Sequence, residues 1–227
     1  MIKILINSIK DIFDKKIFFI SLFPLFMSAL FWSGFFWLWS ESIDLLFTYI
    51  LSNIPYIGSS EWLKKGVETI SGFFAYYQLV IITSMMLVGL VSDKVVDRIN
   101  EKYYHLKKSG FGTTKGSIFV SLKQNLIFFI LFVLAIPFMF IPVVNIVINI
   151  ILWAILIKKP LFYDSVAFYA NKEEFKRLKS SDKFETSVLT YIGASIFLIP
   201  FLGVFVYILQ LLIFAHFNLK RLKALRG

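Results

Sequence analysis

The sequence contains no cysteine, two histidines and only 14 acidic residues in 227 positions. Without cysteine, a disulfide framework, a thiolate metal site and a cysteine nucleophile are all excluded. Neither His105 nor His216 has a carboxylate or a second histidine at metal-ligand spacing, and the common nucleotide-binding and hydrolase motifs are missing. We therefore expect no enzyme activity, no metal and no cofactor, and we interpret His216 as a side chain at a membrane interface.

Charged residues are absent from four long stretches of the chain. These stretches are 17–39, 70–91, 126–157 and 187–217, with 23, 22, 32 and 31 residues. Apolar runs of 18 or more residues are typical of segments in lipid, where a charge at mid-depth costs at least ~2.5 kcal/mol. A soluble globular enzyme is thus excluded, and the lipid bilayer is the first predicted partner.

The basic residues lie between these stretches and predict which side of the membrane each segment faces. Residues 40–69 carry four acids and two lysines, whereas 22 of the 24 Lys and Arg lie in the segments 1–16, 92–125, 158–186 and 218–227. Because basic segments stay in the cytoplasm, we expect both termini there and residues 40–69 outside.

Two of the basic segments are expected to form helices in the cytoplasm. Residues 92–108 have apolar side chains at helical spacing and extend the second span into water, ending at Ser109-Gly110. Residues 158–186 form the other segment, helical around Lys172 to Lys179. Lys172 to Lys183 contains five bases and three acids. We interpret it as a solvated face and expect no nucleic-acid binding.

The first two apolar stretches have the length of single membrane crossings, and the last two do not. At ~1.5 Å per residue, 17–39 and 70–91 each cover a hydrocarbon core of about 30 Å. The other two are too long for one comfortable crossing and too short for two. Helix-breaking prolines lie near their middles, at Pro137 and Pro142 and at Pro200.

We predict that each of these longer stretches forms a re-entrant helical hairpin. Its limbs of about 11 to 15 residues would enter the membrane partway and return to the same side. The alternative for 126–157 is a single kinked crossing, which would place 158–186 outside. The predicted fold is a single all-α membrane domain over 1–227, with two long transmembrane helices that extend into the cytoplasm and two partly penetrating hairpins.

Three segments share the pattern Ile-Pro-x-x-(Gly or Asn) and are predicted to be structural turns. They contain Pro55 and Gly58, Pro142 and Asn145, and Pro200 and Gly203. The last two would start the second limb of each hairpin, so that a helix N-terminus with unpaired N–H groups lies within the membrane. Such an end can hold an anion without a buried lysine.

The candidate anion ligands are therefore Asn145 and Asn149, one helical turn apart, together with Gly203. Lys15 and Lys16 precede the first span and could concentrate anions at its cytoplasmic mouth. Two simpler interpretations stay open. The turns can be only structural, and the two lysines can only anchor the first span. No carboxylate lies in any charge-free stretch, which argues against a proton-coupled carrier.

Several short motifs in this order resemble the CysZ-type sulfate permease family and its broader relatives, the etoposide-induced membrane proteins. The motifs are Gly89 to Val95, Ile141 to Asn145, Trp153-Ala154, Tyr163-Asp164 and Ile199 to Gly203. The resemblance implies a bacterial inner-membrane homo-oligomer that takes up sulfate, or a related oxyanion, for cysteine synthesis.

In this family the sulfate site is expected in a Gly-hydrophobic-Arg turn just before the first span. The corresponding residues here are Phe13 to Ile17, with Lys15 and Lys16 and neither glycine nor arginine. A lysine binds sulfate as a point charge rather than with a bidentate fork, and Asp14 repels it. The alternative function is a membrane scaffold or partner-binding protein of the same fold that does not transport.

Overall fold

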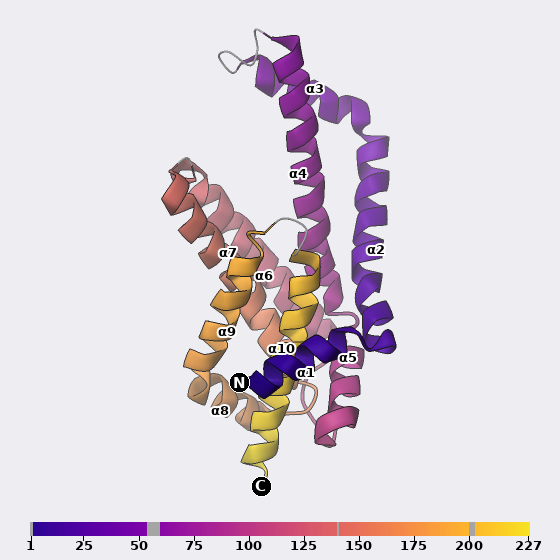
Figure 1. Ribbon diagram of the computed structural model, residues 1–227, viewed down its shortest axis with the longest axis vertical. Coiled ribbons are helices and arrows are strands. Elements are labelled where there is room, and N and C mark those ends of the chain that lie inside the picture. The colour runs from indigo at the N-terminus through magenta and orange to yellow at the C-terminus, as the bar shows by residue number, and fades with distance from the viewer. Residues whose placement is uncertain (1, 54–59, 140, 200–202) are drawn as a thin grey trace. The chain divides into compact units, whose positions relative to one another are not determined.

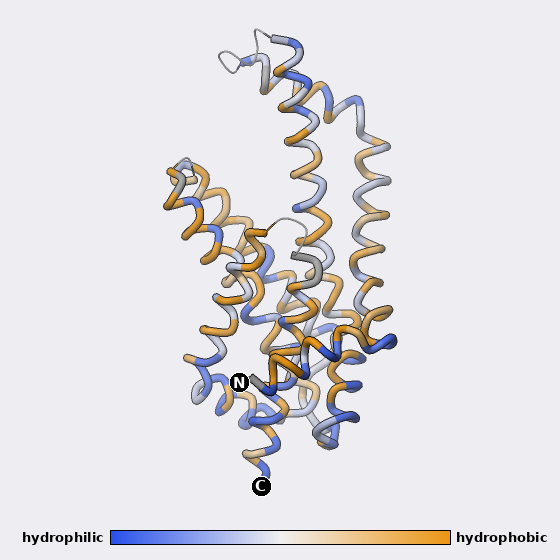
Figure 2. Tube along the Cα trace, viewed as in Figure 1, coloured by the Kyte–Doolittle hydropathy of each residue, from blue (hydrophilic) through white to orange (hydrophobic). Residues whose placement is uncertain are grey.

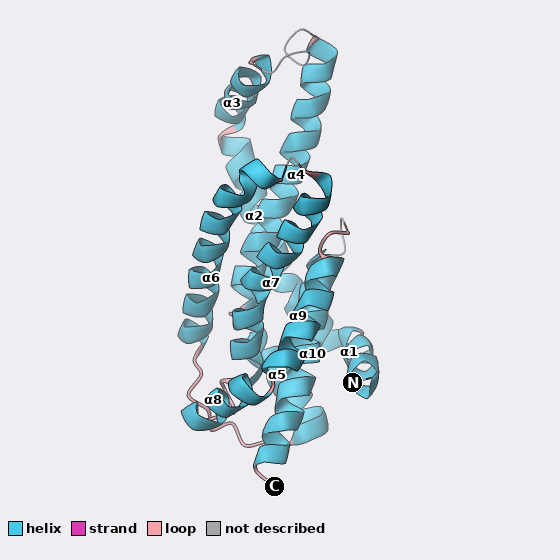
Figure 3. Cartoon of the chain, turned by 90° about the vertical axis from the view of Figure 1, so that its left-hand side faces the viewer, coloured by secondary structure: helices cyan, strands magenta, loops and turns pink. Residues whose placement is uncertain are grey.

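The computed structural model describes residues 2–53, 60–139, 141–199 and 203–227, and all regular structure within them is helical (Figures 1 and 3). The elements are α1 (Ile2–Ile12), α2 (Lys15–Leu38), α3 (Ser40–Ser52), α4 (Glu61–Val88), α5 (Ser92–Ile99), the π-helical turn η1 (Asn100–Tyr104), α6 (Thr114–Ala135), the 3-10 turn η2 (Ile136–Phe138), α7 (Pro142–Val166), α8 (Lys172–Ser181), α9 (Lys183–Ile196) and α10 (Gly203–Leu225). The predicted all-α class is confirmed.

Within the described ranges, four helical segments are long and apolar enough to cross a membrane. They are Lys15–Leu38, Glu61–Val88, Thr114–Phe138 and Val143–Val166. The first two cover the predicted crossings 17–39 and 70–91 except for residue 39 and residues 89–91. The chain divides into two compact units, one of residues 24–84 and one of residues 1–23 and 85–227, and we describe each by itself. The single domain over 1–227 stays a prediction.

The longer apolar stretches each turn back on themselves within the larger unit. As predicted, α7 begins at Pro142, α10 begins at Gly203 and Pro137 lies in the turn η2. Pro55, Gly58 and Pro200 lie outside the described residues. Helices α6 and α7 pack along one another, as do α9 and α10. The depth to which either pair enters a membrane, and the side it returns to, stay predictions.

The helices of the first pair, and α10 of the second with 23 residues, are longer than the predicted limbs of about 11 to 15 residues. Helix α6 has 22 residues and α7 has 25, because both continue beyond the charge-free stretch. Helix α7 runs through Lys158 and Lys159 and also through Pro160, whose missing N–H does not end it. The absence of charge therefore marks the apolar part of each helix and not its ends.

Trp153 of α7 joins the two helical pairs. Its buried indole stacks on the ring of Phe197, at the end of α9, with ring centroids 4.9 Å apart and planes 7° from parallel. On its other side, the ring of Phe128 from α6 lies 5.7 Å away. Aromatic contacts of this kind add about 0.5 to 1.5 kcal/mol each to the burial of apolar area.

The predicted helix after the second span is present but shorter than expected, and its place in the cytoplasm stays a prediction. A turn at residues 89–91 separates α4 from α5, and the helix ends at Tyr104 rather than at Ser109-Gly110. His105 adopts a left-handed conformation with φ of 54°. The Asn100 side chain holds this reversal, because it accepts from the Leu106 N–H and donates to the Leu106 carbonyl, both at 2.9 Å.

The predicted helix around Lys172 to Lys179 is confirmed as α8. It starts with a capping box in which the Asn171 side chain accepts from the backbone of Glu173 and Glu174, and Glu174 accepts from the Asn171 N–H. Arg226 binds the same Glu174 carboxylate through Nε at 2.8 Å and Nη2 at 2.9 Å. The end of the chain is thereby attached to α8.

The smaller unit is a helical hairpin in which α2 and α4 share polar contacts. Trp32 Nε1 donates to Thr83 Oγ1 at 2.9 Å, and the Ser33 and Tyr76 hydroxyls lie 2.9 Å apart. Tyr76 also packs its ring against Phe36 at 5.8 Å. These bonds satisfy polar side chains that lipid could not.

The link between η1 and α6 passes close to the end of α7, where only glycine fits. Gly110 N donates to Phe168 O at 2.9 Å, and Gly112 N donates to Ala167 O at 2.8 Å. A Cβ added at Gly110 would lie 2.1 Å from the Ala167 carbonyl oxygen, which belongs to the backbone and cannot rotate away.

We therefore expect Gly110→Ala to destabilise the protein by about 3 kcal/mol, because the link must move off α7. Gly34→Ala is the control, since a Cβ there meets nothing within 4 Å and should change stability by less than about 1 kcal/mol. Thermal unfolding in detergent measures both. Equal melting temperatures for the two variants would show that the close approach is not required.

Candidate functional site

Helix α6 turns its polar face toward protein and its apolar face outward. Ser117, Ser121 and Gln124 repeat at intervals of three or four residues and are buried. The exposed side chains between them are large and apolar, as at Phe119, Leu122, Leu126 and Phe129. Figure 2 shows mainly hydrophobic colouring along α6 and α7, interrupted by hydrophilic positions. A helix with this distribution is stable against lipid rather than water.

The buried face of α6 meets a carboxylate on α7. Ser117 Oγ donates to Asp164 Oδ1, and the Asp164 side chain is fully buried. Among the described residues, Asp164 Oδ2 and the Ser121 hydroxyl make no hydrogen bond of ordinary geometry, although the Ser92 side chain lies close to Asp164. Buried polar atoms without a partner are uncommon and call for an explanation. This polar contact between α6 and α7 is therefore a candidate site for a polar group.

Asp164 bears on the argument about proton coupling. It lies beyond the charge-free stretch 126–157 and beyond Lys158 and Lys159, in the segment predicted to face the cytoplasm, although α7 extends to Val166. A buried acid therefore lies on the same helix as the apolar stretch. The absence of a carboxylate from the charge-free stretches still argues against a proton-coupled carrier, and this stays a prediction.

A second polar contact joins α7 to α10. Asn218 Nδ2 donates to Ser165 Oγ at 2.7 Å, and that hydroxyl donates to the Phe162 carbonyl at 3.0 Å. Both residues are buried. This contact and the Ser117–Asp164 bond are made by neighbouring residues of α7, which is thus held to both of its partner helices by polar groups.

The most extensive polar cluster gathers around Asp11 of α1, whose side chain is fully buried. Its Oδ1 accepts from Lys102 Nζ at 2.6 Å and from the Tyr103 hydroxyl at 3.1 Å. Its Oδ2 lies 2.8 Å from His216 Nε2 on α10. We call these residues, with Tyr104, the Asp11 cluster.

The Asp11 cluster corrects the interpretation of His216 as an interfacial side chain. The residue is fully buried, and both ring nitrogens are engaged, Nε2 by Asp11 and Nδ1 by the Tyr104 hydroxyl at 3.0 Å. Burial, with Tyr103 and Asp11 nearby, raises the pKa of Tyr104 to about 12, so its hydroxyl keeps a proton to donate. The same hydroxyl lies 3.0 Å from the His216 carbonyl. The imidazole is thus fixed in one orientation.

The pKa of Lys102 determines the pH range over which its contact with Asp11 stabilises the fold. The hydrogen bond to Asp11 raises the pKa of Lys102 above its usual 10.5. Because the unfolded chain has the usual value, this stabilisation is fully present below about pH 10.5. It is lost as the pH rises through the raised pKa.

Asp97 of α5 makes a similar contact nearby. The Tyr169 hydroxyl donates to Asp97 Oδ1, while Lys108 Nζ lies 2.6 Å from Asp97 Oδ2. Burial and the Asp97 charge raise the pKa of Tyr169, which keeps it a donor. This contact holds α5 and the following link against the end of α7.

The predicted site residues Lys15 and Lys16 open α2 and are exposed. Asp14 accepts from Lys16 N at 3.0 Å and Ile17 N at 3.5 Å, so it caps this helix. Burial pushes the Asp14 pKa up, but these bonds and the charge of Arg98 outweigh it and lower the pKa. A carboxylate therefore already occupies the N–H groups that an oxyanion would use at this turn.

The other predicted ligands are not brought together with these lysines by any described interaction. Asn145 and Asn149 lie in the first turns of α7, where Asn149 Nδ2 donates to the Asn145 carbonyl at 2.9 Å and to Asn145 Oδ1. Gly203 opens α10. Their role in anion binding stays a prediction.

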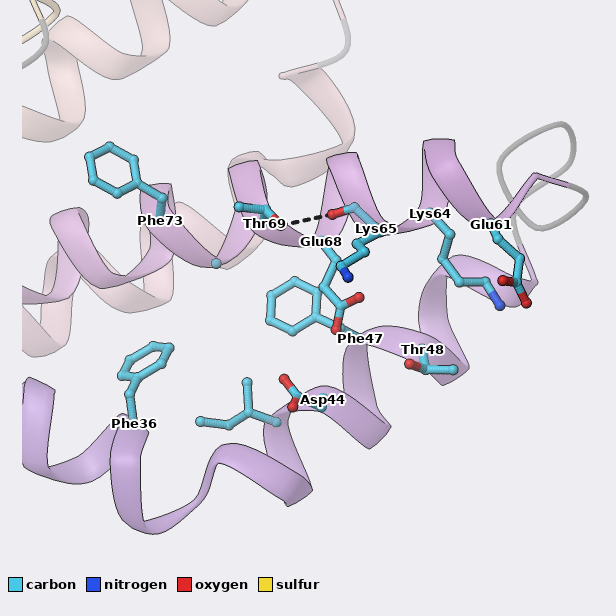
Figure 4. A pocket seen from close by; sticks show the side chains of 12 residues that line it. Phe36, Asp44, Phe47, Thr48, Glu61, Lys64, Lys65, Glu68, Thr69 and Phe73 are labelled. Atoms are coloured by element: carbon cyan, nitrogen blue, oxygen red, sulfur yellow. Dashed lines mark hydrogen bonds between the residues drawn. The ribbon is translucent and has the colours of Figure 1, made fainter.

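A large cavity of about 670 Å³ lies in the smaller unit, between α3 and α4 (Figure 4). Its charged lining consists of three acids and two lysines: Asp44, Glu61, Glu68, Lys64 and Lys65. The balance is net negative, which is the wrong sign to attract an oxyanion. We do not regard it as the anion site.

Helices of membrane-crossing length, with polar side chains turned inward and apolar ones outward, define a multi-pass membrane protein. The model of the sulfate transporter CysZ/etoposide-induced protein 2.4 family matches residues 4–207. The chain therefore belongs to this family, as its motifs predicted, and a membrane transport role fits that membership. Comparisons with curated proteins and with solved structures gave no significant match.

We expect Asp11→Ala to cost about 3 kcal/mol or more, because it leaves His216 buried without its partner and removes the counter-charge of Lys102. Helix α1 should then exchange its backbone hydrogens faster. Lys10→Ala changes the exposed neighbour on the same helix and should have little effect. Hydrogen exchange of Ile2–Ile12 and melting in detergent measure the difference. Indistinguishable variants would contradict an essential role for the Asp11 cluster.

Proposed function

We propose that the protein is a permease or channel that moves sulfate, or a related oxyanion, across the bacterial inner membrane to supply cysteine synthesis. The observation that carries this proposal is the family match over residues 4–207. The same proposal makes the protein a non-enzyme and a homo-oligomer with both termini in the cytoplasm. The orientation is supported by the 22 basic residues in four segments, because basic segments stay on the cytoplasmic side.

The interior of the larger unit supplies chemistry that suits a permeating oxyanion. Ser117 and Ser121 line the buried face of α6, and hydroxyl groups can bind an anion without adding charge. Asp164 lies beside them and repels an anion when ionised. In this proposal, the anion approaches the hydroxyls most easily when Asp164 is protonated, which would couple transport to pH.

The alternative function, a membrane scaffold without transport, is favoured by one observation. Asp14 caps the turn before the first span, where the family's sulfate site is expected. The exposed Lys15 and Lys16 attract anions there but offer no bidentate fork. A scaffold would show no flux of any oxyanion and would copurify with a stable partner.

Uptake of labelled sulfate into proteoliposomes tests the transport proposal. Flux above that of empty vesicles is expected, with thiosulfate and sulfite as competitors. Replacing Lys15 and Lys16 by alanine should lower the flux about tenfold at low salt, because local anion concentration falls. The control replaces Lys3 and Lys10, which are also exposed and near the N-terminus. Flux equal to that of empty vesicles for every oxyanion would favour the scaffold.

A further inference from the structure

A second cavity, in the larger unit, is surrounded by lysines. It has a volume of about 360 Å³ and lies where α7, α8 and α9 meet α6. The lysines at its edge are Lys158 and Lys159 of α7, Lys179 of α8 and Lys183 of α9. Figure 1 shows α8 leading into α9 at one end of the unit. Residues from three separate helices thus place four positive charges around one space.

No acidic side chain lines this cavity. Three of the nearby acids have other partners, and the fourth, Glu173, is exposed and does not line the cavity. Glu174 binds Arg226 at 2.8 Å, while Asp182 and Glu185 lie 3.6 Å and 3.5 Å from Arg221. Among the described residues, none of the four lysines forms a salt bridge. Lys172 to Lys183 was interpreted as a solvated face, but two of its lysines, Lys179 and Lys183, line this cavity.

Four uncompensated ammonium groups around one cavity repel each other and attract an anion. Lys158 is held inward, because its Nζ donates to Ser187 Oγ at 2.6 Å. Lys159, Lys179 and Lys183 are exposed at the rim and free to reach an incoming group. The arrangement supplies charge from several directions.

The rest of the lining is mainly apolar and aromatic, with the hydroxyl-bearing Tyr163 and Thr186 as its polar members. Phe162 and Phe175 meet edge to face at 5.0 Å, and Val120 of α6 completes this surface. A small, fully hydrated oxyanion gains nothing from such a surface. An amphiphile with an anionic head and a hydrocarbon chain uses both parts of the cavity.

The position of the cavity agrees with such an occupant. Lys158 and Lys159 directly follow the charge-free stretch 126–157 and open the segment predicted to face the cytoplasm. Basic pockets at this level of a helical membrane protein are suited to lipid head groups. The phosphate of an anionic phospholipid and the lysine rim would then meet at the membrane surface.

We propose that this cavity binds the phosphate head group of an anionic phospholipid, with part of its acyl chain on Phe162, Phe175 and Val120. The lysines select for charge, and the aromatic surface selects for a lipid over free phosphate or sulfate. This site is separate from the transport proposal and needs no flux to exist.

Native mass spectrometry of the detergent-purified full chain tests the proposal with phosphatidylglycerol as the probe. Replacing Lys179 and Lys183 by glutamine should weaken phosphatidylglycerol binding at least tenfold. The control replaces Lys172 and Lys176, two exposed lysines of α8 that do not line the cavity, and should change binding less than twofold. Phosphatidylcholine should bind weakly to all of these proteins.

Three results would overturn the proposal. The two double variants could lose affinity equally, which would indicate general charge attraction. Phosphatidylcholine could bind as tightly as phosphatidylglycerol. Inorganic phosphate or sulfate could displace the lipid at equal concentration, which would make the site one for free oxyanions. Melting curves check that the variants fold, and Lys159→Gln, which changes one exposed residue, replaces the Lys179 and Lys183 pair if that variant unfolds.

Discussion

The larger unit depends most on the hydrogen bonds that the buried Asp11 carboxylate accepts. Asp11 lies on α1 and binds residues of η1 and α10, so it connects the beginning, the middle and the end of the chain. A carboxylate without partners in this position would cost several kcal/mol. Lys102, Tyr103 and His216 each supply a donor to it. If α1 moved away, the imidazole and the ammonium group would lose their acceptor together. The N-terminal helix is therefore an integral part of this unit.

A second constraint is that polar side chains face the interior and apolar ones face outward, the reverse of a water-soluble protein. In α6, serine and glutamine face the protein while phenylalanine and leucine face outward. Bilayer hydrocarbon gives no hydrogen bonds, so polar groups find partners on neighbouring helices. Ser117 with Asp164, and Ser165 with Asn218, follow this rule on the two sides of α7. The same rule gives a transport protein its polar interior, because groups that cannot face lipid are available to a permeating ion.

The sequence predicted local features better than distant contacts. Prolines and charge-free stretches predicted where α7 and α10 begin, since both depend on residues close in the chain. The contact between Asp11 and His216 was missed because 205 positions separate them, and no local pattern marks it. Helix α7 is longer than the sequence predicted. Two lysines and Pro160 lie within it, and its packing against α6, α9 and α10 keeps this part helical. The cavity at Lys158 was missed for a related reason, because its lysines come from separate helices.

The central claim is that each apolar pair returns the chain to the side from which it came. The sequence has no cysteine, so a single introduced cysteine is the only thiol to react with a reagent that cannot cross the membrane. Glu61→Cys and Lys172→Cys place that thiol at exposed positions on either side of the predicted membrane. In intact cells, the account predicts labelling at position 61, and labelling at position 172 only after the membrane is opened. Labelling at position 172 in intact cells would contradict it.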